Sequence, residues 1–338
     1  MAGKRIDPPA RERGAALLTV LLLVAVIAVM AATGLEKLRL STRLGGNAIM
    51  LDRARAYAQA AETLATTRIT ALLQRDASKV TLAGGWYNRP FPLPVPDGTA
   101  IARVVDGGNC FNLNSLVTRG GDGRYAANPP AVEQFARLMR LIDVPNGGRI
   151  AAATADWIDS DDTPLPGGAE DSAYLGGQPG YRTGATLMAD PSELRAVAGV
   201  SAVTYTRLRP WICTLPAAER SVINFNTLLP EQAALFAMLL PDTMSVGQAR
   251  ALLMRRPPDG YADRDAIWKA PGLSGITADQ RAQEQADVTT HWFALTVDVR
   301  LGQVSMQERG LIDASTLPAR LVSRQWGDEG PNLTRTAP

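Results

Sequence analysis

The sequence has few of the side chains that most enzyme active sites use: it contains one histidine, His291, and two cysteines among 338 residues. A single histidine excludes histidine-rich metal sites and leaves one candidate base for hydrolase chemistry. Two cysteines cannot build a four-cysteine zinc site. The chain also lacks the basic surplus of dedicated nucleic-acid-binding proteins, because 35 basic residues face 33 acidic ones. We therefore expect neither an enzyme nor a nucleic-acid partner.

A long uncharged segment stands near the N-terminus. Residues 15–32 form a run of 18 residues whose only polar side chain is Thr19, which meets the length criterion for a membrane-spanning helix. The run is either a cleaved secretory signal or a retained anchor, and its length favours the anchor. Arg13-Gly14 directly before it is an edge at which prepilin peptidases cut. A cytoplasmic N-terminus is indicated by the basic residues that precede the run, which are Lys4, Arg5, Arg11 and Arg13.

We expect the helix to continue beyond the membrane as an amphipathic helix over residues 34–79. Gly34 and Gly45-Gly46 lie between the two parts and are expected to loosen the helix there. The alternative is an anchor, a flexible neck and a separate packing helix. Continuity is favoured by apolar residues at steps of three and four, the spacing of one buried stripe, namely Leu51, Ala54, Ala58, Ala61, Ala65, Ile69 and Leu72.

Strand patterns occur on both flanks of a central helical region. Residues 291–301 alternate apolar with other side chains, which predicts a half-buried strand. Residues 99–105 are rich in β-branched side chains and predict another, and 304–312 and 320–326 are weaker candidates. The prolines of residues 80–98 predict a loop or an extended segment outside any ladder. Two strand groups on either side of mostly helical residues indicate a helical domain inserted into a small sheet domain.

A short motif occurs twice in the central region. Residues 112–116 read NLNSL and residues 224–228 read NFNTL. Asn, Ser and Thr are good helix N-caps, and both copies precede helical patterns, at 131–142 and 231–240. The residues leave open whether this is an internal repeat or two independent caps.

The most informative chemistry lies in residues 156–171, where six carboxylates occur in sixteen residues without Lys or Arg. Such like charges repel one another unless a cation or solvent screens them. Calcium takes six to eight oxygen ligands in flexible geometry and suits such a segment. An EF-hand is rejected because Pro164 stands where that loop needs its glycine. The residues alone leave open a calcium site or a solvated acidic loop.

Cys110 and Cys213 both follow the membrane segment. If this part of the chain lies outside the cytoplasm, a disulfide between them is expected. The alternative is two separate buried thiols.

Two further patterns suggest other functions. Residues 222–276 resemble a helix-hairpin-helix DNA-binding domain, as an anchored DNA-uptake protein would carry. The hairpin, residues 241–245, has no glycine and includes an acidic residue, so we expect a version used only for packing. His291 would have to serve an anchored hydrolase, but no G-x-S-x-G motif accompanies it, and we expect a structural role.

Four segments together resemble the type II secretion minor pseudopilin K family (general secretion pathway protein K). They are Arg13-Gly14 followed by AALLTVLLLV, the CFNLNSL segment, ADWIDSDDTP with GAEDSAYL, and INFNTL. The resemblance runs from about residue 11 to 312, in the family's motif order, and the acidic stretch is its most specific part.

The resemblance implies an α+β pseudopilin fold, in which a long N-terminal helix packs on a small antiparallel sheet and a large all-α domain is inserted. The organisation it implies is a leader at 1–14, a transmembrane part at 15–33, a periplasmic amphipathic helix at 34–79, a sheet domain from 80–111 and 287–326, an inserted α-domain at 112–286 and a flexible tail at 327–338.

The resemblance also implies a function at the tip of the periplasmic pseudopilus, where the chain would cap the fibre and limit or initiate its assembly. The implied partners are the minor pseudopilins I, J and H, the major pseudopilin G, the prepilin peptidase and the inner-membrane secretion platform. The protein would cross the inner membrane once, with its bulk in the periplasm.

Several residue roles come with the resemblance. Cleavage is expected after Gly14, with N-methylation of Ala15. Thr19 stands where major pilins carry a glutamate that pairs with the preceding subunit, and its absence suits a tip subunit, because an unpaired carboxylate in the membrane is costly. The family binds calcium in the α-domain, which implies ligands at Asp159, Asp161, Glu170 and Asp171, with Asp162 and Asp156 as additional candidates.

Overall fold

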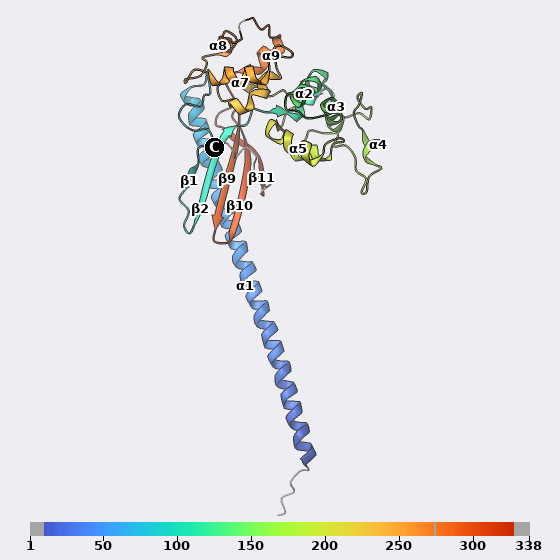
Figure 1. The fold of residues 1–338 in the computed structure, drawn as a ribbon. Helices are drawn as coiled ribbons and strands as arrows, with labels where there is room; N and C mark the ends of the chain where they lie inside the picture. The colour runs from blue at the N-terminus through green and yellow to red at the C-terminus, as the bar shows by residue number, and fades with distance from the viewer. Residues whose placement is uncertain (1–9, 274, 328–338) are drawn as a thin grey trace, which may run out of the picture.

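The computed structural model describes residues 10–273 and 275–327. Figure 1 shows a long helical stalk with a head gathered around its C-terminal end. The helices are α1 (Ala10–Arg75), α2 (Pro129–Leu141), α3 (Gly147–Ile158), α4 (Asp171–Tyr174), α5 (Ala202–Leu208), α6 (Ala233–Ala237), α7 (Val246–Met254), α8 (Arg264–Trp268) and α9 (Gln280–Gln285), with the 3₁₀ turns η1 (Leu113–Leu116), η2 (Pro191–Ala196), η3 (Arg209–Trp211) and η4 (Pro230–Gln232). The strands are β1 (Phe91–Leu93), β2 (Gly98–Asp106), β3 (Phe111–Asn112), β4 (Val117–Arg119), β5 (Tyr125–Ala127), β6 (Ile212–Cys213), β7 (Ile223–Asn224), β8 (Ala286–Asp287), β9 (Trp292–Leu301), β10 (Val304–Asp313) and β11 (Arg320–Trp326).

The stalk is one uninterrupted helix, α1, and its N-terminal part is apolar and long enough to cross a membrane. The predicted continuity is confirmed. The expected loosening at Gly34 and Gly45-Gly46 does not occur, since a helical glycine costs only about 1 kcal/mol relative to alanine. Residues 1–9 of the expected leader at 1–14 and residues 328–338 of the expected tail at 327–338 lie outside the described residues.

The C-terminal part of α1 packs on an antiparallel five-stranded sheet with the order β1-β2-β9-β10-β11. The helix contributes a stripe of small side chains, of which Ala54, Ala58, Ala61 and Ala65 are fully buried. These side chains let the helix lie close to the sheet. Alternate residues of β9, from Phe293 to Leu301, form the apolar face beneath it. The predicted pseudopilin arrangement of helix on sheet is therefore confirmed.

One expectation about this sheet is wrong. The proline-rich segment was expected outside any ladder, yet Phe91–Leu93 pairs with β2, with Phe91 opposite Ala102. Pro92 is tolerated because β1 is the edge strand, where one side of the backbone needs no partner.

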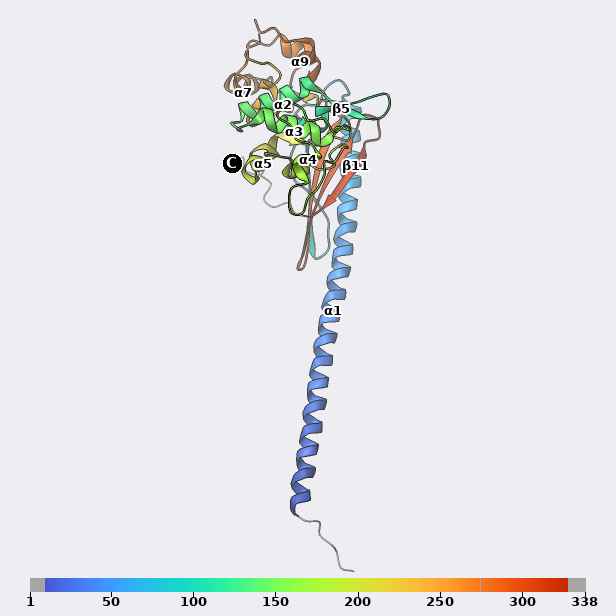
Figure 2. The ribbon, with the colours of Figure 1, turned by 90° about the vertical axis from the view of Figure 1, so that its right-hand side faces the viewer.

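The chain leaves the sheet after β2 and returns at β9, and the intervening residues form the helical part of the head (Figures 1 and 2). This part is mainly helical but not purely so. It also contains three two-stranded ladders, β3 with β6, β4 with β5, and β7 with β8. The expectation of an all-α insertion is corrected in this respect, because segments of two or three residues are too short to show strand periodicity.

The repeated motif has the same structure in both copies. Asn112 and Asn224 each end a short strand in a parallel pair, and each accepts a hydrogen bond from the backbone N–H two residues later. The second asparagine, Asn114 or Asn226, then binds both the N–H and the C=O of one distant residue, Met188 in the first copy and Tyr261 in the second. We therefore divide the helical part into a first unit, from β3 to β6, and a second unit, from β7 to β8, which share this local motif.

Candidate metal site

The candidate metal site begins on helix α3. Every residue from Ile150 to Ile158 is buried, because this alanine-rich helix is apolar on all sides and lies within the helical core. Two carboxylates are therefore carried into the interior: Asp156 on the last turn and Asp159 at the C-terminal cap.

A third carboxylate, Glu170, meets these two from the following loop. One oxygen of each of Asp156, Asp159 and Glu170 lies within 4.8 Å of the others, and all three side chains are at least nine-tenths buried. No basic side chain pairs with any of the three among the described residues. The cluster is therefore a concentrated negative charge in the protein interior.

Asp156 also shapes the loop that brings Glu170 back. Its carboxylate accepts the backbone N–H groups of Leu165 at 3.1 Å and Ala169 at 2.7 Å. Gly168 is needed for this approach, since a Cβ there would lie 1.9 Å from Asp156 Oδ2. Asp156 thus holds the loop against α3 and places Glu170 beside Asp159.

The other two carboxylates have unsatisfied oxygens. Asp159 Oδ1 and both oxygens of Glu170 are buried without a hydrogen-bond partner. Burial raises the pKa of Asp159 to about 7, and the nearby Asp161 and Asp156 add to the effect. Burial, followed by the charge of Asp159, likewise raises the pKa of Glu170 to about 7. Buried unpartnered carboxylates that repel one another are the donor set that a hard cation satisfies.

The remaining acidic residues lie outside this cluster. Asp171 points elsewhere: its carboxylate binds Arg182 Nη1 at 2.8 Å and the N–H and hydroxyl of Thr183. These contacts, led by the Thr183 N–H, lower the pKa of Asp171. Asp161 is exposed and accepts the Thr163 N–H, and Asp162 is exposed.

The structure brings together only some of the six expected calcium ligands. Asp159, Glu170 and the additional candidate Asp156 form the cluster, whereas Asp161, Asp171 and the additional candidate Asp162 lie outside it. Glu170 is the N-cap of α4 and Asp171 is its first residue, and the two side chains point in different directions. The i, i+3 spacing of Asp156 and Asp159 on α3 is the signal that could have found the pair.

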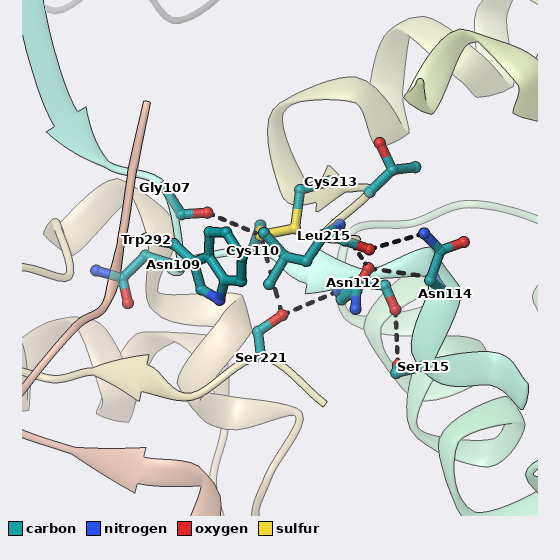
Figure 3. The surroundings of a disulfide bond; sticks show 12 residues. Gly107, Asn109, Cys110, Asn112, Asn114, Ser115, Cys213, Leu215, Ser221 and Trp292 are labelled. Carbon is teal, nitrogen blue, oxygen red and sulfur yellow. Dashed lines mark hydrogen bonds between the residues drawn. A yellow bond between two sulfur atoms is a disulfide. The ribbon is translucent and has the colours of Figure 1, made fainter. Parts of the chain in front are cut away.

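A disulfide between Cys110 and Cys213 joins two segments 103 residues apart (Figure 3). The cysteines lie beside the parallel pair of β3 and β6, and Cys110 is buried. Ser221 Oγ beside them accepts the backbone N–H of Asn112 at 3.0 Å. The side chain of Asn112 in turn binds three backbone groups of the segment that follows Cys213, from Leu215, Ala217 and Glu219. The bond therefore closes the first of the two units.

The other singled-out residues have simpler surroundings. Thr19 lies on the exposed apolar part of α1, and its hydroxyl donates to the Ala16 carbonyl at 2.8 Å. Ala15 is exposed on the same helix, and the Gly14 backbone is helical too.

His291 is exposed before β9, and no hydrogen bond of its ring is found among the described residues. Arg256, which lies in the segment 222–276 that resembles a DNA-binding domain, turns inward and donates to the carbonyls of Phe225 and Leu228 instead of facing solvent to bind phosphate.

Comparison with known proteins decides the family. Two family models described as "Type II secretion system (T2SS), protein K" match residues 109–217 and 223–289, which correspond to the two structural units. A type II secretion system protein K of Klebsiella pneumoniae is 37% identical over 326 residues, 94% of this chain and 97% of that protein. The Pectobacterium carotovorum protein K is 33% identical with the same coverage. The chain belongs to the type II secretion system protein K family.

A solved structure agrees with this assignment. A chain of the GspK-GspI-GspJ complex from the enterotoxigenic Escherichia coli type 2 secretion system matches with a TM-score of 0.72 and 30% identity. The match covers 82% of this chain and 97% of that chain. As a protein K family member with an α+β pseudopilin fold, the chain is a minor pseudopilin of type II secretion.

Proposed function

We propose that this protein K caps the tip of the pseudopilus, in a complex with the minor pseudopilins I and J. The supporting observation is the position of the helical part, which covers the end of the helix–sheet unit opposite the membrane-spanning end of α1 (Figure 1). A further subunit stacked above would meet this bulk. The related GspK is found in a complex with GspI and GspJ. The uncharged Thr19 also suits a subunit with no preceding subunit to pair with.

The cap hypothesis is tested by removing the bulk. Asp106 and Trp292 end and begin neighbouring strands, and Gly107 N donates to Trp292 O at 2.8 Å, so a short linker can replace residues 110–288. We expect cells with this shortened chain to assemble longer pseudopili, measured by electron microscopy. The control is the full chain with His291→Ala, a substitution at an exposed position that keeps the bulk. Unchanged pseudopilus length with a stably produced shortened chain would contradict the cap.

We further propose that the chain is cleaved after Gly14 and methylated on Ala15, and that α1 anchors it in the inner membrane. The head would lie in the periplasm, where the major pseudopilin G, the minor pseudopilin H and the inner-membrane platform are its partners. The exposed apolar part of α1 that begins at Ala15 supports this.

Intact mass and N-terminal sequencing of the membrane-extracted protein test the processing. We expect a chain that begins at Ala15 and is heavier by one methyl group in cells with prepilin peptidase, and an uncleaved chain without it. Cleavage beyond residue 32, or a leader retained in both strains, would contradict the proposal.

We also propose that Asp156, Asp159 and Glu170 hold a calcium ion. Three carboxylates provide up to six oxygens, and backbone carbonyls or water complete the six to eight that calcium takes. The unsatisfied oxygens of Asp159 and Glu170 support this assignment. A bound cation would neutralise the cluster and fasten the loop between α3 and α4 to α3, which stabilises the first unit.

A further inference from the structure

A second buried acidic group lies far from the candidate metal site, between α1 and the sheet. Glu308 of β10 is 0% exposed, and neither of its carboxylate oxygens has a hydrogen-bond partner. Its neighbours across the sheet are Val297 on β9 and Trp326 on β11, which carry no charge. An ionised carboxylate in such surroundings is costly.

Two charged groups face Glu308 from the elements packed against it. Glu62 comes from α1 and is 7% exposed, and Arg324 comes from β11. Arg324 donates to both oxygens of Glu62 through Nε and Nη2, and its Nε lies 3.8 Å from Glu308 Oε1. Two carboxyl groups therefore share one guanidinium.

This buried group contains two acidic side chains and one basic side chain. If both carboxyls ionise, the seam between helix and sheet holds an unbalanced negative charge. If Glu308 keeps a proton, it is neutral and can donate that proton in a hydrogen bond to Glu62. The Glu62–Arg324 pair is then balanced, and no buried charge remains without a partner.

We propose that Glu62, Glu308 and Arg324 form a proton-dependent clasp that holds α1 on the sheet when Glu308 is protonated and loosens when Glu308 ionises. The clasp lies midway along the buried stripe of α1, which runs from Ala54 to Leu73. Since α1 also carries the apolar segment, the clasp determines whether the head and the stalk behave as one rigid body. Ambient pH would thereby regulate the stiffness of this connection.

The direction of the pH effect follows from the two acids. Burial, together with the adjacent Glu62, raises the pKa of Glu308 to about 8. Burial acts to raise the pKa of Glu62, but the side chains of Arg324 and Glu308 together lower it below its ordinary value. A raised pKa in the folded state means that the stability from Glu308 is complete below its unfolded pKa of 4.5 and is lost as the pH rises to about 8.

Hydrogen exchange followed by mass spectrometry on the full chain in detergent micelles tests the clasp. After correction for intrinsic exchange rates, we expect protection of residues 54–73 to fall at least about tenfold between about pH 6 and about pH 9, since one pKa unit is a tenfold change in equilibrium. In Glu308→Gln, an uncharged side chain that can still donate to Glu62, we expect protection to change by less than about twofold over this range. The matched control, Glu284→Gln at an exposed glutamate, should follow the unmodified chain.

Three results would overturn the clasp. The first is a pH dependence in Glu308→Gln equal to that of the unmodified chain. The second is an equal loss of protection in α2 and α3, which points to general unfolding. If Glu308→Gln does not fold, carboxyl ¹³C shifts of the glutamate-labelled unmodified chain decide instead. A glutamate resonance titrating near the pKa of about 8 supports the clasp, and glutamates that all titrate at ordinary values overturn it.

Discussion

In calcium, we expect the full chain to unfold at a higher temperature than in chelator, and we expect Asp159→Asn combined with Glu170→Gln to abolish the difference. A ligand at about one hundred times its dissociation constant stabilises the folded state by about 2.7 kcal/mol. For a chain of this size that corresponds to a rise of roughly 4 °C in the melting temperature. Circular dichroism melts in micelles, with calcium and with chelator, measure this difference in melting temperature.

The same variant should be more stable than the unmodified chain in chelator, because it removes repulsion between buried carboxylates. Asp161→Asn is the matched control: it neutralises an acid of the same loop outside the cluster and should retain the calcium response. Equal melting of the unmodified chain with calcium and with chelator would end the calcium proposal.

The pH dependence of the stability of the cation-free protein is a second test of the same site. The pKa values of Asp159 and Glu170 are raised to about 7 in the folded state, so their contribution to stability is present at acid pH and is lost as the pH rises toward 7. Calcium binds the ionised carboxylates, so its effect should grow over that interval. A calcium effect that is larger at acid pH would contradict the assignment.

Loss of the disulfide is the second large effect that we expect. Cys110→Ser with Cys213→Ser should cost about 2–5 kcal/mol of unfolding free energy, since the bond closes a loop of about 100 residues whose freedom it restricts in the unfolded chain. The second unit contains no cysteine, so the first should unfold earlier. Denaturant titration monitored by limited proteolysis of the two units measures this.

Ser221→Ala is the matched control for the disulfide. It leaves the bond in place and removes only the hydroxyl that accepts the Asn112 N–H, which should cost about 1 kcal/mol. Identical unfolding of the cysteine variant and the unmodified chain would show that the hydrogen bonds of Asn112 alone hold the first unit closed.

The regular elements of this protein could be predicted from local patterns. The steps of three and four in the small residues of α1 and the alternation in β9 are properties of neighbouring residues, and each states which face is buried. The apolar segment is predictable in the same way. β1 was not predicted, because a strand tolerates proline when it lies at the edge of a sheet. The position of a strand within the sheet is a property of the whole sheet and not of neighbouring residues.

The carboxylate cluster was only half predictable. The acidic segment can be recognised in the sequence by its lack of Lys and Arg. The direction of each side chain, however, depends on how the loop returns to α3. Asp156 looked like the weaker candidate, yet it organises that return, and Asp171 looked equivalent to Glu170 but is taken by Arg182 and Thr183.

By itself, the sequence determined the apolar helix long enough to cross a membrane, the buried stripe of α1, the strand β9 and the presence of an acidic segment, because each of these is encoded in the spacing or composition of adjacent residues. The tertiary structure alone decided which charges meet. Glu62 and Arg324 lie 262 residues apart in the chain, and their pairing, like the unpartnered state of Glu308 beside them, exists only once α1 lies on the sheet. The energetic cost of a buried charge depends on its surroundings in space, and these are set by the fold.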